Sequence, residues 1–370
     1  MARLAVSGGG IAGMAAALAA ARSGHEITLF SGRDAPPLVG GLQLAPNGWA
    51  ALTTLGVADS AAAASLRLND IMVRALDSGS TLIQLPLHEA YASFDRAALA
   101  SCLSDALAAQ PSVTRKSLNL EHIHQPGETV CLVTDDGASA EFDGLVAADG
   151  ASGPGRRHVA PSASQIGATG RVAMRAQVPL ATLPAHFALP TSNLWLGRGV
   201  HVVHYPIGHM LNLVVTMPAE RTGPGWQHQM LPAGTPLAVL AGSDITWVKT
   251  PLPPAGTAGC WRRGSVVLAG EAAHSMPPHL AQGAGQGLQD AACLQGWLAA
   301  GDDMDAAFSG YARTRAGDVA RIVRKADMSG RIMGLSGPAA HLRDIALNLG
   351  GARLMQSWLA EVWAADPSLA

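Results

Sequence analysis

A glycine-rich turn close to the N-terminus constrains the fold of this chain more than any other feature. The apolar run from Ala2 to Ser7 stops at three consecutive glycines, and apolar side chains then recur at helical spacing from Ile11 to Leu18. Gly24 stands where that helix should stop, and a second apolar run follows from Glu26 to Phe30. The order strand, glycine turn, helix, strand predicts a βαβ unit and therefore an α/β fold.

Residues 8–13 also fit the pattern GxGxxG, which serves the pyrophosphate of a dinucleotide. Gly8 permits the tight turn, Gly10 lets the backbone approach the pyrophosphate, and Gly13 lets the helix pack closely on the strand. The helix, which includes Ala12 in its first turn, would point its positive end at the phosphate charge. Because the pattern stands between a predicted strand and a predicted helix, it predicts dinucleotide binding rather than a purely structural turn.

The acidic residue that usually follows the second strand of such a unit is missing from this sequence. Ser31 stands there, followed by Gly32 and Arg33. A serine hydroxyl can make one hydrogen bond to a ribose hydroxyl, but it cannot accept from both hydroxyls as a carboxylate does. Arg33 either reaches an adenine face or a phosphate, or it is a solvated residue of the turn. Both hypotheses stay open.

Composition narrows the classes of function. The chain has 370 residues, of which 48% are hydrophobic, enough to bury a large core in two lobes. Only 14% are charged and the net charge is −2, so no basic field attracts nucleic acid or an anionic membrane. No apolar run reaches the roughly 20 residues of a membrane span, and the opening segment lacks the basic region of a signal peptide. The cysteines are far apart, which disfavours disulfides and a metal site and favours the cytoplasm: Cys102, Cys131, Cys260 and Cys293.

Two later apolar runs end in a glycine next to an acidic residue. The run from Leu145 to Ala148 leads into Asp149, and the run from Ser265 to Ala269 leads into Gly270 and Glu271. Both predict buried strands that deliver a carboxylate to the carboxyl edge of a sheet, where ligands bind in open α/β folds. Between residues 171 and 261 prolines multiply and short β-prone segments replace the alternation of strand and helix. This predicts a smaller sheet domain inserted into the nucleotide-binding fold.

Five spaced motifs, in order along the chain, resemble those of the group A aromatic flavoprotein monooxygenases. They lie in residues 8–13, 42–47, 94–99, 149–150 and 270–287. The segment from Trp195 to Pro206 resembles in particular the salicylate hydroxylases and the 3-hydroxybenzoate 6-hydroxylases, which have the para-hydroxybenzoate hydroxylase fold. The resemblance runs from residue 4 to about residue 330.

The resemblance implies an α/β fold with a Rossmann-like FAD-binding domain, an inserted β-sheet substrate domain and C-terminal helices. The expected division is 1–170 and 263–335 for FAD, 171–262 for the substrate sheet and 336–370 for a C-terminal helix. It also implies that NADH or NADPH reduces FAD without a nucleotide domain of its own. A flavin C4a-hydroperoxide would then transfer oxygen from O2 to a small phenolic or hydroxypyridine ring. Such an enzyme would be a monomer or a homodimer.

The resemblance carries the FAD contacts over by position. Asp149 is expected near the pyrophosphate, and the backbone N–H groups of residues 283–285 are expected at the flavin pyrimidine ring. A helix that starts there would point its positive end at the ring that becomes anionic on reduction. Glu271 replaces the family's aspartate and is one methylene longer, so its carboxylate must either withdraw or displace the ribityl chain. The positions predicted to contact FAD are Gly8, Gly10, Ala12, Gly13, Ser31, Arg33, Gln43, Arg96, Asp149, Glu271, Gly283, Ala284 and Gly285.

Three residues are candidates for the chemistry. In a strand from His201 to Tyr205, alternation puts both side chains on one face, roughly 13 Å apart. In the resembling hydroxylases a histidine at the position of His201 helps to deprotonate the substrate phenol, Tyr205 borders the substrate and Gln282 lies near the flavin. Imidazole suits this role because it titrates near neutrality and a phenolate ring is the better nucleophile. Without the resemblance, a single strand histidine is more commonly structural.

Some assignments stay open at this stage. Arg175 either touches the cofactor or the substrate or touches neither, whereas His274 and His279 are expected to be structural or to lie behind the residues that touch the flavin. Leu, Met and Val side chains together with Trp195 are expected to wall the pocket. Three alternatives remain: an FAD-dependent epoxidase or oxidase acting on a non-phenolic substrate, an NAD-dependent dehydrogenase, and a binding protein with weakened FAD affinity. The glycine motif near residue 283 disfavours the dehydrogenase, and Ser31 with Glu271 favours the binding protein.

Overall fold

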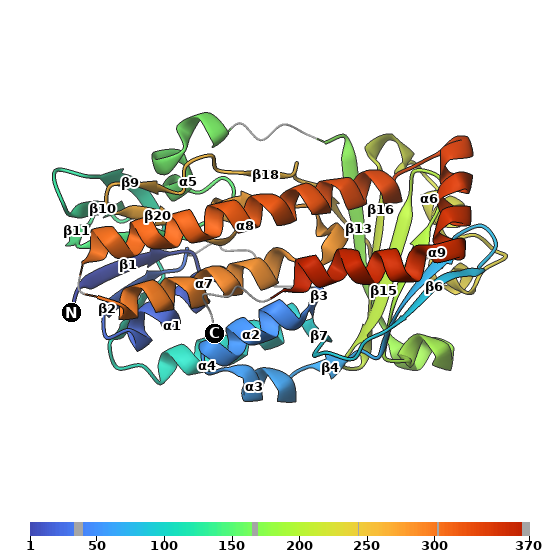
Figure 1. The fold of residues 1–370 in the computed structure, drawn as a ribbon, viewed down its shortest axis with the longest axis horizontal. Helices are drawn as coiled ribbons and strands as arrows, with labels where there is room; N and C mark the ends of the chain where they lie inside the picture. The colour runs from blue at the N-terminus through green and yellow to red at the C-terminus, as the bar shows by residue number, and fades with distance from the viewer. Residues whose placement is uncertain (33–39, 165–168, 243, 302, 365–370) are drawn as a thin grey trace.

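Two lobes lie along the long axis of the molecule, each built around its own sheet (Figure 1). The computed structural model describes residues 1–32, 40–164, 169–242, 244–301 and 303–364. The helices of the described residues are α1 (Ile11–Arg22), α2 (Pro46–Thr54), α3 (Ala58–Ala63), α4 (Arg96–Ala108), α5 (Pro154–Val159), α6 (Trp226–Met230), α7 (Gly283–Ala299), α8 (Met304–Met333) and α9 (Gly337–Trp363).

The first lobe contains a six-stranded sheet in the order β19-β20-β12-β1-β2-β8. All of its pairs are parallel except the one between β19 and β20. The apolar runs of the sequence become its central strands because both faces of the sheet are covered. The strands are β1 (Arg3–Ser7), β2 (Glu26–Phe30), β8 (Val113–Lys116), β12 (Gly144–Ala147), β19 (Arg262–Arg263) and β20 (Val266–Leu268).

Helix α1 packs between this sheet and α7, and nearly all of its side chains are buried. Its alanines let the neighbouring backbones come close. A Cβ atom on Gly270 would lie 2.5 Å from the Cβ of Ala12, and one on Gly287 would lie 3.0 Å from it. Ala12 therefore fixes the spacing between the start of α1 and the segment that follows β20.

The second lobe contains a seven-stranded sheet in the order β17-β13-β16-β15-β14-β5-β6. Two of its strands come from residues 70–86, which the sequence-based division grouped with the first FAD region. The strands are β5 (Asp70–Ala75), β6 (Thr81–Pro86), β13 (Arg171–Pro179), β14 (Thr191–Leu196), β15 (His201–Ile207), β16 (Met210–Pro218) and β17 (Val248–Pro251).

The two faces of this sheet pack against different partners. The outer face, which carries Val202 and Trp195, packs on an apolar cluster that includes Trp226 of α6. The inner face, which carries Tyr205 and Ile207, packs with side chains of α9. Asn212 lies on the inner face opposite Tyr205, and its Oδ1 accepts a hydrogen bond from the backbone N–H of Gly41 (2.8 Å). The inner face is therefore turned toward the first lobe.

Smaller sheets complete the fold. They are formed by β9 (Leu120–His124), β10 (Val130–Thr134) and β11 (Ser139–Phe142), by β3 (Gly41–Leu44), β7 (Ala92–Asp95) and β4 (Leu66–Arg67), and by β18 (Gly256–Thr257) with β21 (His274–Ser275).

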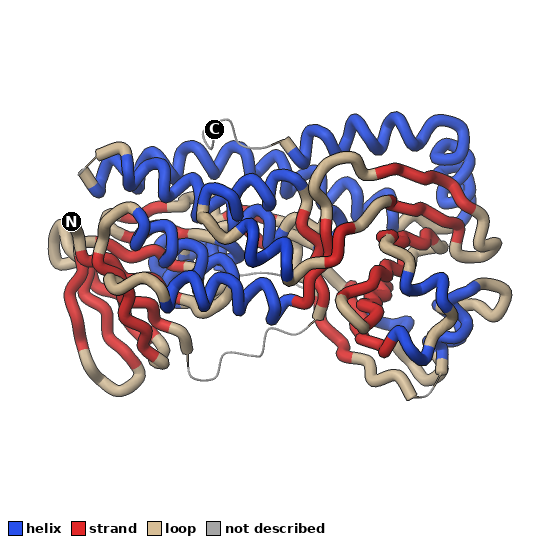
Figure 2. The backbone as a smooth tube through the Cα atoms, turned by 90° about the horizontal axis from the view of Figure 1, so that it is seen from below, coloured by secondary structure: helices blue, strands red, loops and turns tan. Residues whose placement is uncertain are grey.

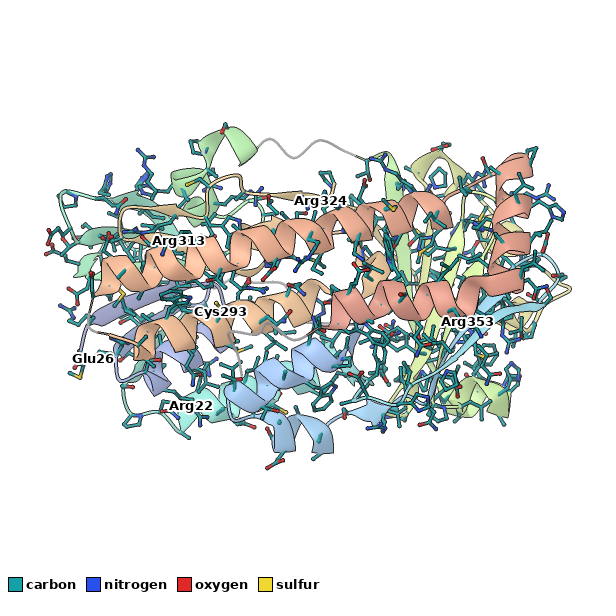
Figure 3. The ribbon with its side chains drawn as sticks, in the orientation of Figure 1. Arg22, Glu26, Cys293, Arg313, Arg324 and Arg353 are labelled. Carbon is teal, nitrogen blue, oxygen red and sulfur yellow. The ribbon has the colours of Figure 1, made fainter. Side chains whose placement is uncertain are left out.

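Helix α8 connects the two lobes. Phe308 near its start belongs to the core of the first lobe, and Met333 at its end packs with the inner-face cluster of the second. Arg313 and Arg324 mark its course in Figure 3, and Arg353 marks that of α9. Seen from below, the long C-terminal helices form a layer along one side of the molecule (Figure 2). None of the helices that the structure describes is long and apolar enough to cross a membrane.

Candidate functional site

The carboxyl ends of three parallel strands bring together segments that lie far apart in the sequence. Strand β1 ends at Ser7, β12 at Ala147 and β20 at Leu268. The backbone continues this alignment, because the N–H of Ala148 donates to the carbonyl of Ser7 (2.8 Å) and that of Ala269 to Ala147 (2.9 Å). The glycine turn, Asp149 and the segment after β20 therefore meet at one edge, where ligands bind in this class of fold.

The glycine turn separates positions that need glycine for packing from one that faces open space. Gly8 has φ +112°, and a Cβ there would lie 2.2 Å from the carbonyl oxygen of Ala148. A Cβ on Gly13 would lie 1.9 Å from the carbonyl oxygen of Gly8, whereas one on Gly10 would meet nothing within 4 Å. Gly10 caps α1 through its backbone alone. The first turn of α1 is thus an open cradle for an anionic group.

Asp149 lies beside this cradle. Its Oδ2 accepts hydrogen bonds from the N–H of Gly155 (2.8 Å) and from the hydroxyl of Ser7 (3.3 Å). Burial raises the pKa of Asp149 against these stabilising contacts. Its buried Oδ1 has no hydrogen-bond partner among the described residues. The carboxylate can therefore accept a further bond from a ligand that reaches this edge.

A buried ionic cluster lies behind the segment that carries Glu271. The neighbouring Gly270 donates its N–H to Asp290 (2.8 Å), which also pairs with His274 (2.7 Å) and Arg315 (2.8 Å). Burial alone would raise the pKa of Asp290, but His274 and Arg315 lower it to about 2. Glu271 itself is exposed at the edge of the sheet. His274 therefore belongs to a buried ion pair behind the sheet edge.

Two amide groups with unused hydrogen-bonding atoms meet at the start of α7, that of Gln282 at its N-cap and that of Asn47 on α2. The Nδ2 of Asn47 donates to the Oε1 of Gln282 (2.8 Å) and to Gln289 (3.0 Å), and Gln286 also donates to Gln282 (3.0 Å). The Oδ1 of Asn47 and the Nε2 of Gln282 are buried and have no partner among the described residues. One acceptor and one donor thus stay unused on two hydrogen-bonded side chains next to the N-terminus of α7. The sequence analysis included Asn47 in a family segment but gave it no role.

The backbone that leads into α7 is strained. Ala281 has φ +53° and is the only described residue other than glycine with a positive φ. This left-handed conformation costs about 1 kcal/mol or more in an alanine. It turns the chain so that residues 283–285 form the first turn of α7, where their N–H groups have no helical acceptors.

The remaining predicted cofactor positions differ in what their side chains can reach. The side chain of Gln43 is held by two neighbours, because its Oε1 accepts from Tyr91 (2.6 Å) and its Nε2 donates to Ser192 (2.9 Å), which leaves one N–H of the amide for a further contact. The Nε of Arg96 at the start of α4 is buried without a partner among the described residues. Ser31 is half-buried, and a Cβ on Gly9 would lie 2.7 Å from its own Cβ. Arg33 lies outside the described residues.

The inner face of the second lobe presents the predicted catalytic side chains. His201 and Tyr205 are both buried, and burial raises the pKa of Tyr205. Val203 lies between them, opposite Val214 of β16, which in turn pairs with Arg175 of β13. Side chains that are directly opposite in antiparallel strands share a face. Arg175 therefore lies on the inner face with His201 and Tyr205.

Trp195 does not wall this face. Its register partner is Val202, and its ring stacks on that of His204, 6.2 Å away, within the outer cluster. Trp195 therefore lies on the sheet face opposite to Tyr205, whereas the sequence analysis expected it to help wall the pocket. Alternation along β14 was readable in the sequence, but the face depends on its pairing with β15, which the sequence did not specify.

Charged groups surround the space over Val203. The Arg175 guanidinium makes no hydrogen bond or ion pair with any described residue. Burial lowers the pKa of Arg175, and Tyr205, Arg96 and Glu271 are the charged or polar groups near it. On the other side, the ring of His201 lies 5.2 Å from that of His279, edge to face. Burial, followed by His279 and two arginines, lowers the pKa of His201 well below 6.5. The imidazole of His201 is therefore neutral at pH 7.

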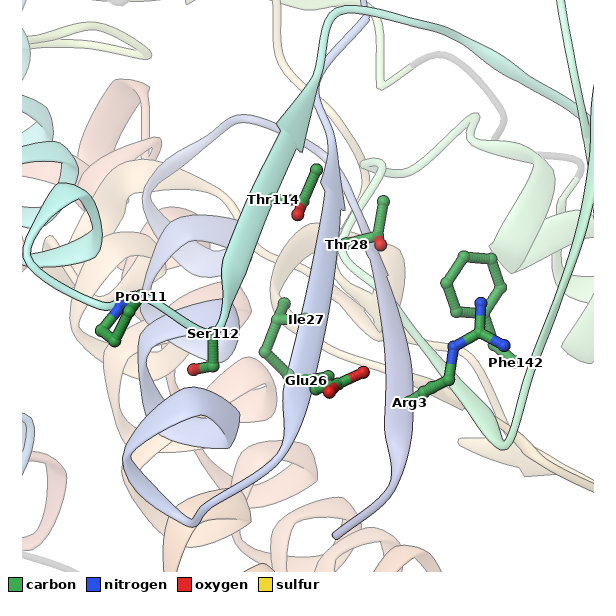
Figure 4. Close-up of a pocket in the computed structure, with 8 residues that line it drawn as sticks. All are labelled: Arg3, Glu26, Ile27, Thr28, Pro111, Ser112, Thr114 and Phe142. Atoms are coloured by element: carbon green, nitrogen blue, oxygen red, sulfur yellow. The ribbon is translucent and has the colours of Figure 1, made fainter.

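A separate pocket lies at the opposite end of the parallel strands (Figure 4). It has a volume of about 350 Å³, and its lining includes Arg3 and Glu26, which begin β1 and β2. Ligands of open α/β sheets bind at the carboxyl ends, so this hollow is not the candidate site. Among the residues that the structure describes, no group of three or more His, Cys, Asp or Glu side chains could hold a metal ion.

Known proteins match this chain along most of its length. A family model described as FAD binding domain matches residues 234–326, and one described as Glucose inhibited division protein A matches residues 3–183. A 3-amino-4-hydroxybenzoate 2-monooxygenase of Streptomyces platensis is 31% identical over 367 residues, which cover 92% of this chain and 91% of that protein. A 3-hydroxybenzoate 6-hydroxylase of Klebsiella oxytoca is 28% identical over 366 residues, covering 93% and 91%.

Solved structures share the fold. Klebsiella pneumoniae HpxO complexed with FAD and uric acid superposes with a TM-score of 0.84 at 21% identity, covering 98% of this chain and 97% of that one. A salicylate hydroxylase substrate complex superposes with a TM-score of 0.79 at 22% identity, covering 100% and 99%. These structures confirm the predicted α/β fold, with its Rossmann-like domain, inserted sheet and C-terminal helices.

Proposed function

The chain belongs to the family of FAD-dependent aromatic monooxygenases, and from this premise we propose that it hydroxylates a small phenolic or hydroxypyridine ring that carries a carboxylate. FAD is the cofactor of this family, and NADH or NADPH is the reductant. The named relatives act on 3-amino-4-hydroxybenzoate, 3-hydroxybenzoate and 6-hydroxynicotinate, all hydroxylated aromatic acids. The observation that carries the proposal is that His201 and Tyr205 share the sheet face that is turned toward the start of α7.

The residues at the edge of the first lobe fit FAD. The cradle at Gly10 suits the pyrophosphate, and the unused Oδ1 of Asn47 and Nε2 of Gln282 suit the donor and acceptor edge of a flavin pyrimidine ring. Asp149 and Arg96 each have a buried polar atom left for the same ligand. When bound, FAD supplies the ring that accepts hydride and activates oxygen.

The first turn of α7 would stabilise negative charge on that ring. Its free N–H groups and the positive end of a 17-residue helix point at one place. Ala281 holds this geometry before any ligand arrives, at the expense of local strain.

The substrate would lie over Val203, between His201 and Tyr205. A neutral imidazole is ready to accept the phenolic proton, which raises the electron density of the ring to be hydroxylated. Tyr205 stays protonated because burial raises its pKa, so its hydroxyl can donate a hydrogen bond to the substrate.

Arg175 is the candidate anchor for a substrate carboxylate. It is a half-buried cation without a hydrogen-bond partner among the described residues, on the same sheet face as Tyr205. A guanidinium binds a carboxylate through two parallel hydrogen bonds, which fix both position and orientation. Such an anchor would favour benzoates and nicotinates over the corresponding neutral phenols.

The decisive experiment uses protein reconstituted with FAD and a panel of 3-hydroxybenzoate, 3-amino-4-hydroxybenzoate, 6-hydroxynicotinate and phenol. We expect at least one of the acids, and not phenol, to stimulate NADH or NADPH oxidation and to gain one oxygen atom from labelled O2. Arg175→Lys should raise KM for that acid more than it lowers kcat. Stimulation by phenol equal to that by the acids would contradict the anchor. Oxidation without oxygen transfer to any ring would contradict the hydroxylase.

A further inference from the structure

We propose that Thr216 recognises the ring position next to the phenolic hydroxyl, so that the enzyme prefers aromatic acids with an amino group or a second hydroxyl at that position. The inference rests on the proposed function, in which the ring lies over Val203 and its hydroxyl faces His201. It narrows the substrate class from hydroxylated aromatic acids to those with two adjacent polar substituents. The sequence analysis gave Thr216 no role.

Thr216 is the neighbour of His201 on the inner face of the second lobe. It lies on β16 directly opposite His201 of β15, next to the opposite pair of Val214 and Val203. Side chains that are directly opposite share a face, and their Cβ atoms are about 5 Å apart. Val215, which precedes Thr216 along the strand, belongs to the outer cluster, so Thr216 points to the inner face. Its hydroxyl therefore lies beside the candidate proton acceptor.

The Oγ1 atom of Thr216 is buried and has no hydrogen-bond partner among the residues that the structure describes. The residue is 1% exposed, so bulk water does not reach this hydroxyl. A buried hydroxyl without a partner is destabilising, and valine has nearly the same shape and a similar preference for strands. A purely structural position would therefore favour valine. A ring that lies over the partly exposed Val203 would supply the missing partner.

The geometry of an aromatic ring decides which substituent can reach Thr216. Adjacent substituents point in nearly the same direction, whereas substituents in meta or para positions diverge. A ring whose hydroxyl faces His201 can therefore bring only an ortho substituent to the side chain next to His201. A threonine hydroxyl both donates and accepts, so it suits an amino group or a second hydroxyl. A hydrogen atom or a methyl group there would leave the hydroxyl unpaired, and a site built in this way discriminates against such analogues.

The neighbour of His201 on the other side is apolar. Leu196 of β14 pairs with His201 on the side away from Thr216, and it belongs to the apolar cluster of the inner face. The two ring positions next to the phenolic hydroxyl therefore meet different surroundings, a hydroxyl on one side and an aliphatic side chain on the other. A polar substituent against Leu196 would have no partner there. The face thus suits one polar substituent next to the hydroxyl, and not two.

The experiment uses FAD-reconstituted enzyme and acids that differ only next to the hydroxyl: 3-amino-4-hydroxybenzoate and 3,4-dihydroxybenzoate, each compared with 4-hydroxybenzoate. Dissociation constants come from the change in flavin absorbance, and kcat/KM comes from oxygen transfer. The wild type should bind each of the first two acids about 10-fold more tightly than 4-hydroxybenzoate, the size of one hydrogen bond. A third hydroxyl, in 3,4,5-trihydroxybenzoate, should not tighten binding further, because it would lie against Leu196.

Thr216→Val should abolish this preference and leave the dissociation constant of 4-hydroxybenzoate within about two-fold of the wild type, because only the hydroxyl is lost. Thr216→Ser keeps the hydroxyl and should keep the preference. Thr216→Ala removes the hydroxyl as well and takes the place of the valine variant if that one does not fold.

The matched control is Thr250→Val. Thr250 stands in the same row of the sheet, opposite Ala173, but three strands from His201, which is about 14 Å by the spacing of strands. This variant should keep the preference of the wild type. An equal loss in Thr250→Val would overturn the inference, because the effect would then belong to the sheet and not to the position beside His201.

Two other results would also overturn the role of Thr216. One is a Thr216→Val or Thr216→Ala enzyme that keeps the wild-type preference, since another group would then contact the second substituent. The other is a wild type that binds and hydroxylates 4-hydroxybenzoate at least as well as the two acids with adjacent substituents, which would leave the proposed hydroxylase standing. A wild type that hydroxylates none of the acids would instead overturn the proposed function, and the inference with it.

Discussion

At the level of single residues, removal of the His201 imidazole should separate flavin reduction from hydroxylation. His201→Ala should still bind FAD and accept hydride, because the residue lies on the second lobe and not in the cradle of the first. Hydroxylation should fall by about 10²–10⁴-fold, the usual effect of losing a general base. The reducing equivalents should then appear as hydrogen peroxide. The measurement is the ratio of product formed to NADH or NADPH consumed.

His204 offers a matched control on the same strand. It points to the outer face, where its ring packs between those of Phe187 and Trp195. His204→Ala should therefore lower stability but leave the ratio of product to NADH unchanged. A His201→Ala enzyme that is stable and fully coupled would show that another group removes the proton.

Asp290 shows how strongly one buried carboxylate can support a site that it does not touch. Asp290→Asn should cost about 3–5 kcal/mol of unfolding free energy, because it removes the buried carboxylate that pairs with both Arg315 and His274. Asp318→Asn removes the partner of an exposed arginine and should cost about 0–1 kcal/mol. Urea unfolding of the two variants compares them. Equal small losses would mean that Arg315 finds another partner.

The sequence predicted residues at the site unevenly. Gly8 and Asp149 stand just after buried strands, and Gly13 lies in the first turn of the helix that follows the glycine turn, so their place at the sheet edge follows from local pattern. Asn47 and Asp290 could not be found in that way. Their importance comes from contacts with residues 235 and 25 positions away along the chain, Gln282 and Arg315. In the sequence both look like ordinary polar residues of helices.

At the level of elements, the start of α1 separates packing from ligand binding. Gly13→Ala should lower the free energy of unfolding by about 3 kcal/mol or more, because the added Cβ would overlap the carbonyl oxygen of Gly8. Gly10→Ala should lower the free energy of unfolding by less than about 1 kcal/mol, since nothing lies within 4 Å of the added Cβ. It should nevertheless weaken FAD binding by about 10-fold, or 1.4 kcal/mol, by filling the cradle. Flavin titration and urea unfolding of both variants test this contrast. Unchanged FAD affinity in Gly10→Ala would place the pyrophosphate elsewhere.

Strands with a clear pattern in their own sequence were predicted well, but the strands that they pair with were not. The strand from Glu26 to Phe30 has the predicted bounds, because a βαβ unit has few alternatives. Strand β15 also has the predicted alternation. The side-by-side parallel pairing of β5 with β14 joins residues about 120 positions apart, from Asp70 with Thr191 to Ala75 with Leu196. Periodicity shows which face of a strand is buried, but not which strand lies next to it.

At the level of the whole molecule, buried neutral histidines should make the protein labile to acid. The pKa of His204 is lowered from 6.5 to about 3, mainly by burial, and those of His201 and His279 are lowered too. The unfolded chain therefore binds protons that the folded protein excludes. Stability should be full above about pH 6.5 and should fall progressively as the pH drops toward 3.

His204→Leu isolates one of these contributions. Between pH 7.5 and pH 4.5, the His204 imidazole alone should lower the free energy of unfolding by about 2–3 kcal/mol. The variant should therefore lose less stability over this interval than the wild type, in urea unfolding at both pH values. If the variant and the wild type lose the same free energy of unfolding between the two pH values, the folded protein admits a proton at His204.

The route of the chain through the second lobe limits how this protein can be recombined. Its seven-stranded sheet draws β5 and β6 from residues 70–86 and the other strands from residues 171–251. Between these two segments the chain returns to the first lobe and forms β12. Exchange of residues 171–251 alone with a relative would therefore split the sheet between two parents, and exchange of residues 70–251 would also replace β12 of the first sheet. A chimera that exchanges the whole second sheet and leaves the first sheet intact therefore requires four crossovers instead of two.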